Sequence, residues 1–185
     1  RGGDQPVHRN PVTIVTLITS LSRAKPIARQ EHEQEKPDMP DILHKVGIKS
    51  SSLNDVYQAL TTIDGLSGWW TSGTRGESKI GGVIQFRFGA GGFDMKVLDL
   101  QPARRVLWQV VEGPEEWVGT KISFDLKQED DWTILLFKHE GWKEPVAFMH
   151  HCSTKWAVFL LSLKALLETG KGAAWPNEIK LDSWE

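Results

Sequence analysis

The side chains best suited to chemistry in this sequence are a few histidines and one cysteine. His139 closes an apolar segment, where a neutral imidazole could orient a ligand or act as an acid or base. A hydrogen-bonded structural histidine is the competing and more common interpretation. His150, His151 and Cys152 are consecutive. Consecutive residues of a helix point in different directions, so these three cannot share a metal ion or form a Cys–His pair. We therefore expect no metal site and no cofactor, an inert Cys152 in the core, and His151 at a cavity edge.

Trp69 and Trp70 stand side by side in the segment 65–76, among small and polar residues. Adjacent residues on a short helix point about 100° apart, so the two rings are not expected to face one spot. One tryptophan should fill the core, and the other should border the opening of a pocket, because ligand pockets favour aromatic walls. The alternative is that both belong to the core or contact another subunit. The spacing alone does not say which ring faces the cavity.

Composition limits the classes of function. The chain has 185 residues, of which 39% are hydrophobic and 25% charged, with a net charge of −2. These values are typical of one globular domain and give no general attraction to nucleic acid, so no nucleic-acid partner is expected. A single cysteine excludes an intramolecular disulfide and fits a cytoplasmic protein. The apolar run 12–21 is too short to span a membrane.

The first 40 residues differ from the rest of the chain. They are polar, charged and rich in turn-forming residues, so we expect residues 1–40 to form a flexible or non-native N-terminal extension. Met39 directly precedes the first regular element, and a natural start at Met39 is a hypothesis that follows. A signal peptide is the weaker interpretation, because no clear cleavage site follows the apolar run. The domain should then cover residues 41–175, with a tail over 176–185.

Hydrophobic periodicity predicts the elements of that domain. Alternation indicates a first strand near 42–48, and Ser52 with Asp55 is typical of a capping box that opens a helix. A second, short helix should follow, broken by Gly65 and Gly68. A long helix should run from about Pro145 to Thr169, with Gly170 after its end. Period-two segments between these helices predict five further strands, within 81–89, 93–102, 104–113, 120–128 and 131–142.

Large apolar side chains are the candidate cavity walls. On the last strand, Leu135, Phe137 and His139 should share the inner face, since Lys138 is better placed outside. The long helix carries an apolar stripe at three- and four-residue steps that includes Phe148 and Trp156. For any single residue plain packing is the simpler interpretation, whereas the set suggests a wide apolar space. The remaining candidates are Phe86, Phe88, Phe93, Met95, Trp108 and Trp117.

The order of these elements resembles the START-like superfamily (SRPBCC, helix-grip fold). Within it, the chain is similar to the group named after the C-terminal domain of the activator of the ninety-kilodalton heat-shock chaperone ATPase. The segments that carry the resemblance are "IKSSSLNDVYQALTTIDGLSGWWT", "GGVIQFRFG", "VLDLQPARRVLWQV", "HEGW" and "WAVFLLSLKALLETGKG". The resemblance implies an α+β fold: a curved six-stranded antiparallel sheet wrapped on a long C-terminal helix, with two short helices closing one end.

The resemblance also implies a cavity between sheet and helix, which in relatives binds apolar small molecules. We therefore expect a small apolar molecule as the ligand, with Trp69 or Trp70 at the entrance and His139 supplying polarity. A cyclase, dehydratase or hydrolase that uses the same cavity is the first alternative. A chaperone-interacting module without a ligand is the second. The sequence leaves open whether the chain catalyses a reaction and whether it forms a homodimer.

Overall fold

The computed structural model describes residues 2–3, 40–49 and 51–183. The expectations about an N-terminal extension and a start at Met39 lie outside these residues, apart from residues 2, 3 and 40. No helix of the described part is both long and apolar enough to cross a membrane.

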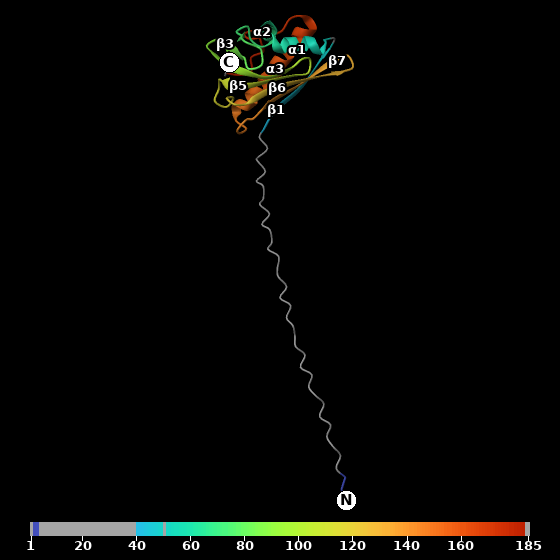
Figure 1. Cartoon of the computed structure of the whole chain (residues 1–185). Coiled ribbons are helices and arrows are strands. Elements are labelled where there is room, and N and C mark those ends of the chain that lie inside the picture. Colours follow the sequence, from blue (N-terminus) through green and yellow to red (C-terminus); the bar gives the residue numbers. More distant parts are fainter. Residues whose placement is uncertain (1, 4–39, 50, 184–185) are drawn as a thin grey trace. The chain divides into compact units, whose positions relative to one another are not determined.

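Ten elements follow one another, nine of them in the order that the periodicity predicts (Figure 1). The three helices are α1 (Leu53–Thr61), α2 (Ile63–Trp69) and α3 (Ala147–Thr169). The strands are β1 (Ile42–Lys49), β2 (Arg75–Gly76), β3 (Val83–Phe88), β4 (Gly91–Gln101), β5 (Arg105–Glu112), β6 (Lys121–Glu129) and β7 (Trp132–Glu140).

The strands form one antiparallel sheet in the order β1-β7-β6-β5-β4-β3-β2. Strands β3 to β7 form a meander. The first strand of the chain, β1, pairs with β7, the last, along its whole length. The predicted α+β helix-grip architecture is confirmed, with one strand more than the six expected. The extra strand, β2, pairs only two residues with β3. An element that short shows no alternation, so the sequence pattern could not indicate it.

The inner face of the sheet carries the core, and its register matches the predicted alternation. On β7, Leu135, Phe137 and His139 are all buried, while Lys138 forms ion pairs with Asp41 and Glu140 on the other face. On β5 and β6 the buried inner positions are Val106, Trp108, Val110, Ile122, Phe124 and Leu126. The three helices lie against the sheet and against one another, which covers the apolar face (Figure 1).

Helix α1 begins at the predicted capping box. The Ser52 hydroxyl accepts a hydrogen bond from the backbone N–H of Asp55, and the Asp55 carboxylate accepts one from the N–H of Ser52. These two bonds satisfy amide groups that a helix start otherwise leaves unpaired. The Ser52 hydroxyl also donates to the Asp55 carboxylate at 2.7 Å, and this bond, together with the one from the Ser52 N–H, holds the pKa of Asp55 below its usual range.

Helix α2 runs through Gly65 and Gly68, so the expectation that these glycines break it is wrong. They serve close packing instead. A Cβ atom at Gly65 would lie 2.7 Å from the Cα and 2.8 Å from the carbonyl oxygen of Ala59, and one at Gly68 would lie 2.9 Å from the Leu166 side chain. Both glycines therefore let α2 approach its neighbours closely.

The two glycines predict unequal effects of alanine. Gly65→Ala should lower the free energy of unfolding by about 2 kcal/mol or more, because the obstacle is the backbone of α1, which cannot move alone. Gly68→Ala meets only the end of a Leu166 side chain and gains helix propensity, so its effect should stay within about 1 kcal/mol. Urea unfolding of both variants measures this difference. Equal losses at the two positions would contradict the packing described for α2.

Helix α3 begins two residues later than predicted. Val146 is extended, with φ −100° and ψ 161°, and is the N-cap, so Pro145 precedes the helix rather than starting it. The predicted end is confirmed, because Gly170 follows with a left-handed φ of 79°, which favours glycine. The apolar stripe of α3 faces the core through Cys152, Trp156, Phe159 and Leu163.

Candidate functional site

Trp69 and Trp70 take different roles at the end of α2. Trp69 is fully buried, and its indole N–H donates a hydrogen bond to the carbonyl oxygen of Ala59 at 3.0 Å. Trp70, at 2% exposure, stacks on Trp69 with ring centroids 5.3 Å apart and also lines a pocket. Trp70 is the C-cap of α2, with φ −109° and ψ −69°, and the two rings meet although adjacent helical positions were expected to point them apart. Neither ring stands at an exposed rim: Trp70 is part of the pocket wall, and Trp69 lies behind it.

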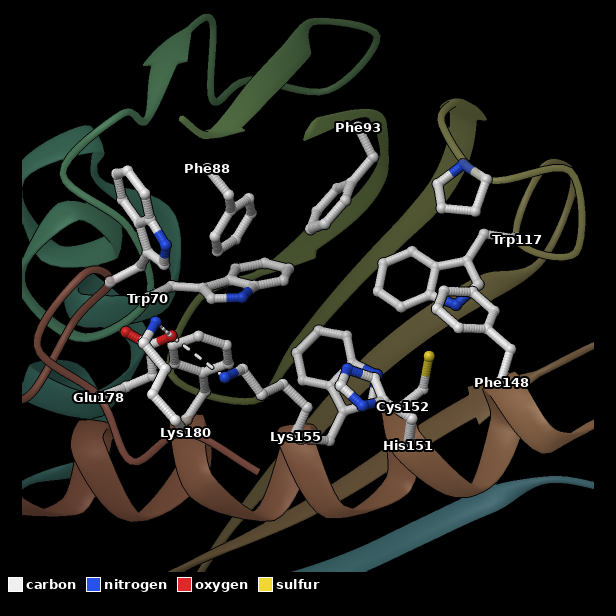
Figure 2. A pocket seen from close by; sticks show the side chains of 14 residues that line it. Trp70, Phe88, Phe93, Trp117, Phe148, His151, Cys152, Lys155, Glu178 and Lys180 are labelled. Carbon is white, nitrogen blue, oxygen red and sulfur yellow. Dashed lines mark hydrogen bonds and ion pairs between the residues drawn. The ribbon is translucent and has the colours of Figure 1, made fainter. Parts of the chain in front are cut away.

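The pocket lies between α3, the neighbouring ends of β3 and β4, the loop before β6 and the C-terminal tail, and its volume is about 270 Å³. Figure 2 shows side chains of α3 pointing toward Trp70, Phe88 and Phe93 across this space. Parallel rings of Trp117 and Trp156, 6.1 Å apart with an angle of 9° between their planes, form another part of the wall. The wall is thus built mainly from flat apolar surfaces.

About half of the side chains expected to face a cavity do line this pocket. They come from the end of α2, from β3 and β4, from the loop before β6 and from α3, and are Trp70, Phe88, Phe93, Trp117, Phe148, His151 and Trp156. The other candidates lie in the core and do not line it, namely Trp69, Phe86, Met95, Trp108, Phe137 and His139.

Sequence reasoning missed the contribution of the C-terminal tail to the wall. Trp175 reaches the pocket because its backbone N–H bonds to the carbonyl oxygen of Trp70 at 2.9 Å. Farther along the tail, Glu178 and Lys180 also line the pocket. The irregular pattern of the tail gave no signal for this position. The remaining unexpected lining residues are Pro114, Cys152, Lys155 and Phe159. The helical stripe could have identified Cys152 and Phe159, since both belong to it.

Charged side chains gather at one end of the pocket. One oxygen of Glu178, whose side chain is 1% exposed, accepts hydrogen bonds from the ammonium groups of Lys155 at 3.1 Å and Lys180 at 2.9 Å. Burial opposes the ionisation of Glu178, but the bonds from these lysines prevail and hold its pKa below the usual range. Glu178 is therefore a carboxylate at neutral pH.

His151 borders the pocket, as expected. Its Nδ1 atom lies 2.8 Å from a carboxylate oxygen of Asp182, and its ring is nearly parallel to that of Phe148, 10° between planes. A carboxylate at Nδ1 favours the tautomer that carries the proton there. The contact with Asp182 also fastens the tail to α3.

The Cys152 thiol is one group in the wall that could act as a nucleophile, and its surroundings disfavour that role. The side chain is buried, which raises the pKa of the thiol to about 12, and the nearby Trp117 indole offsets only part of this effect. The thiolate is the reactive form of cysteine. Cys152 is thus an uncharged part of the wall at neutral pH, which agrees with the expectation of an inert residue.

His139 is buried behind the wall in a hydrogen-bond chain. The indole N–H of Trp156 donates to Nδ1 at 3.1 Å, so the imidazole proton is on Nε2, which donates to the Thr120 hydroxyl at 2.8 Å. That hydroxyl in turn donates to the carbonyl oxygen of Trp117 at 2.6 Å. Burial lowers the pKa of His139 to about 3. Both ring nitrogens are engaged, so the geometry matches the structural interpretation of this histidine.

Within the described part of the chain, no cluster of three or more His, Cys, Asp or Glu side chains could hold a metal ion.

Comparisons with known proteins agree with this architecture. The family model described as "Activator of Hsp90 ATPase homolog 1-like protein" matches residues 50–168. The solution structure of the Aha1 dimer from Colwellia psychrerythraea is 50% identical, with a TM-score of 0.68, and the match covers 72% of this chain and 100% of that one. No match was found among curated proteins.

Two more distant structures share the fold. Protein SSP2350 from Staphylococcus saprophyticus is 17% identical, with a TM-score of 0.62, over 73% of this chain and 97% of its own. Protein MLL2253 from Mesorhizobium loti is 16% identical, with a TM-score of 0.62, over 69% and 96%. Because the family model covers most of the domain and the Colwellia psychrerythraea relative is half identical, the chain belongs to the activator of Hsp90 ATPase homolog 1-like family of the START-like superfamily.

Proposed function

We propose that this protein binds a small, flat, apolar molecule in the pocket between α3, the sheet and the tail. The observation that carries the proposal is the wall itself, in which Trp70, Trp117 and Trp156 present ring faces to a common space. Pockets lined by aromatic side chains with a few polar groups are typical of small-molecule sites. Side chains that only form a core pack closely and leave few voids larger than a water molecule between them.

The size of the pocket favours a compact ligand. Its 270 Å³ would hold about nine water molecules at roughly 30 Å³ each, and ligand pockets begin near 300 Å³. Water in contact with so much aromatic surface is readily displaced by an apolar molecule. A flat ring system matches both the volume and the flat aromatic surfaces of the wall.

Binding is better supported than catalysis by the groups present. The Cys152 thiol stays protonated, and both nitrogens of His139 are bonded behind the wall. The interpretation as a cyclase or hydrolase relied on His139 as an acid or base. Because both nitrogens of this histidine take part in the buried hydrogen-bond chain, its role is better described as structural.

Fluorescence titration with N-phenyl-1-naphthylamine, a neutral probe that brightens in apolar sites, tests the proposal. The protein should bind one equivalent, and Phe93→Trp, which adds volume inside the pocket, should weaken binding about ten-fold or more. Leu136→Trp adds the same ring on the exposed face of β7 and should leave binding unchanged. Absence of saturable binding, or equal binding by Phe93→Trp, would overturn the proposal.

A second proposal concerns partners. The 50% identical relative from Colwellia psychrerythraea was solved as a dimer, and the matching family is named for an activator of a chaperone ATPase. We propose on this basis that the chain also forms a homodimer and contacts a chaperone.

A further inference from the structure

We propose that the C-terminal tail from residue 177 to residue 183, the tail flap, opens to admit the ligand to the pocket. The flap forms part of the pocket wall through Glu178 and Lys180. Its role as the entrance rests on the proposed function, whereas the opening itself requires no ligand. The two statements can therefore be tested separately.

The surfaces that a ligand would contact are shielded from solvent. Trp70 and Trp156 are each 2% exposed, and Trp117 is 7% exposed. Cys152, which also lines the pocket, is 3% exposed. A molecule with two rings can reach these faces only if part of the wall moves aside. Closure of the wall behind it would then bury most of its surface, as is usual in small-molecule sites.

Regular elements hold the greater part of the wall in place. Phe88 and Phe93 belong to β3 and β4, which pair along the whole length of β3. Trp156 belongs to the middle of α3, and Trp70 is packed among the rings of the core. Movement of any of these side chains out of the wall would disturb a strand, a helix or the core, which are the most stable parts of a domain.

The tail is fastened by its backbone as far as Trp175. The Ala173 N–H donates to the Ser162 hydroxyl at 2.7 Å, and the Trp175 N–H donates to the carbonyl oxygen of Trp70 at 2.9 Å. The Trp175 ring also meets the edge of the Phe88 ring, with centroids 6.1 Å apart. These contacts make Trp175 the fixed end from which the tail flap extends.

Two side-chain contacts join the tail flap to α3. Glu178 accepts a hydrogen bond from Lys155 at 3.1 Å, and a carboxylate oxygen of Asp182 lies 2.8 Å from Nδ1 of His151. Between them Ile179 is 71% exposed, and the flap belongs to no helix or strand. Bonds between side chains can be exchanged for bonds to water without breaking a regular element. The tail flap is thus the part of the wall best suited to open.

Cys152 reports the opening without a ligand, because it is the single cysteine of the chain. Burial raises the pKa of its thiol to about 12, so N-ethylmaleimide should modify it mainly in open molecules. In Figure 2, Glu178 and Lys180 lie at one end of the pocket, and Cys152 lies toward the other. A substitution of Glu178 therefore changes the flap without touching the thiol. Intact-mass spectrometry at successive times gives the rate of modification.

Glu178→Gln keeps the shape of the side chain and weakens its bond to Lys155, so Cys152 should react about ten-fold faster than in the wild type. The double variant Glu178→Gln with Asp182→Asn weakens both contacts and should react about thirty-fold faster. Urea unfolding of the same variants shows how much of the acceleration comes from a change in global stability.

Glu116→Gln is the matched control. It removes the same charge from a position that does not line the pocket, and beside burial the charge of Glu116 is a cause of the raised pKa of Cys152. A purely electrostatic effect on the thiol would therefore appear in this variant, whose rate should rise by about two-fold or less. If the flap variants react no faster than the control, or if their lost global stability accounts for the acceleration, the tail flap is overturned.

The association rate constant of N-phenyl-1-naphthylamine tests the flap as the entrance. Stopped-flow fluorescence should give a value about ten-fold higher in Glu178→Gln than in the wild type, and an unchanged value in Glu116→Gln. Equal values in all three proteins would overturn the entrance role and leave the binding proposal standing. If the probe does not bind, the proposed function and the entrance role are both overturned, while the modification of Cys152 decides separately whether the flap opens.

Discussion

Trp70→Ala is expected to lower the free energy of unfolding by about 3–5 kcal/mol, the range for removal of a buried tryptophan from a packed core. Trp70 is 2% exposed and is the ring around which the aromatic cluster is organised. Its contacts include rings on α2, on the sheet and on α3, with centroid distances from 4.2 to 6.4 Å to Trp69, Phe86, Phe93, Trp108, Trp156 and Phe159. Alanine would leave a cavity that these partners cannot all close.

Urea unfolding of purified variants measures the loss, and Trp132→Ala is the matched control. Trp132 is 40% exposed, and its replacement removes mainly the contacts of the ring with the ammonium groups of Lys49 and Lys164. The free energy of unfolding should therefore fall by only about 1 kcal/mol. A loss for Trp70→Ala as small as that of the control would mean that the ring does not join the helices to the sheet.

Acidification from pH 8 to pH 5 is expected to lower the free energy of unfolding by about 2 kcal/mol through His139 alone. The pKa of this histidine is about 3 in the folded protein, because burial disfavours the imidazolium, and about 6.5 in the unfolded chain. Between these values only the unfolded state takes up the proton. The stability that the neutral His139 side chain contributes is therefore fully present above pH 6.5, and it is lost as the pH falls from 6.5 toward 3.

Unfolding curves at several pH values test this dependence in His139→Gln, which keeps a donor and an acceptor but does not titrate. The variant should be less stable at pH 8 and should lose most of the slope between pH 6.5 and pH 5. His150→Gln, at an exposed position of α3, should keep the wild-type slope. An unchanged slope in His139→Gln would show that the buried hydrogen-bond chain does not hold this histidine neutral.

The fold could be predicted largely from local patterns. Alternation along 132–140 indicated both the last strand and its inner face, and the capping box at Ser52 indicated the start of α1. The two-residue strand β2 and the continuity of α2 could not be predicted. In α2 the deciding fact is a backbone approach of Ala59 to Gly65, and a sequence shows a glycine without showing what comes near it.

The site was predictable only where a regular element sets the direction of a side chain. The α3 stripe indicated Phe148 and Trp156, which line the pocket, but the same stripe made Cys152, which also lines it, seem plain core. His139 was placed inward correctly, yet its role depends on Thr120 and Trp156, which lie far away in the sequence. The tail carries no periodicity, so Glu178 and Lys180 could not be anticipated.

The pocket wall is built partly from core side chains and partly from the irregular tail, and this difference bears on how the protein can evolve. Trp70, Trp117 and Trp156 hold the core together as well as the pocket, so selection for folding constrains them. Lys180 projects from an irregular tail and is half-exposed, and neither it nor Glu178 belongs to the hydrophobic core. Substitutions of the half-exposed Lys180 can therefore alter the pocket wall at a low cost in stability. A domain of this kind can thus vary its pocket wall through the tail while its aromatic core stays the same.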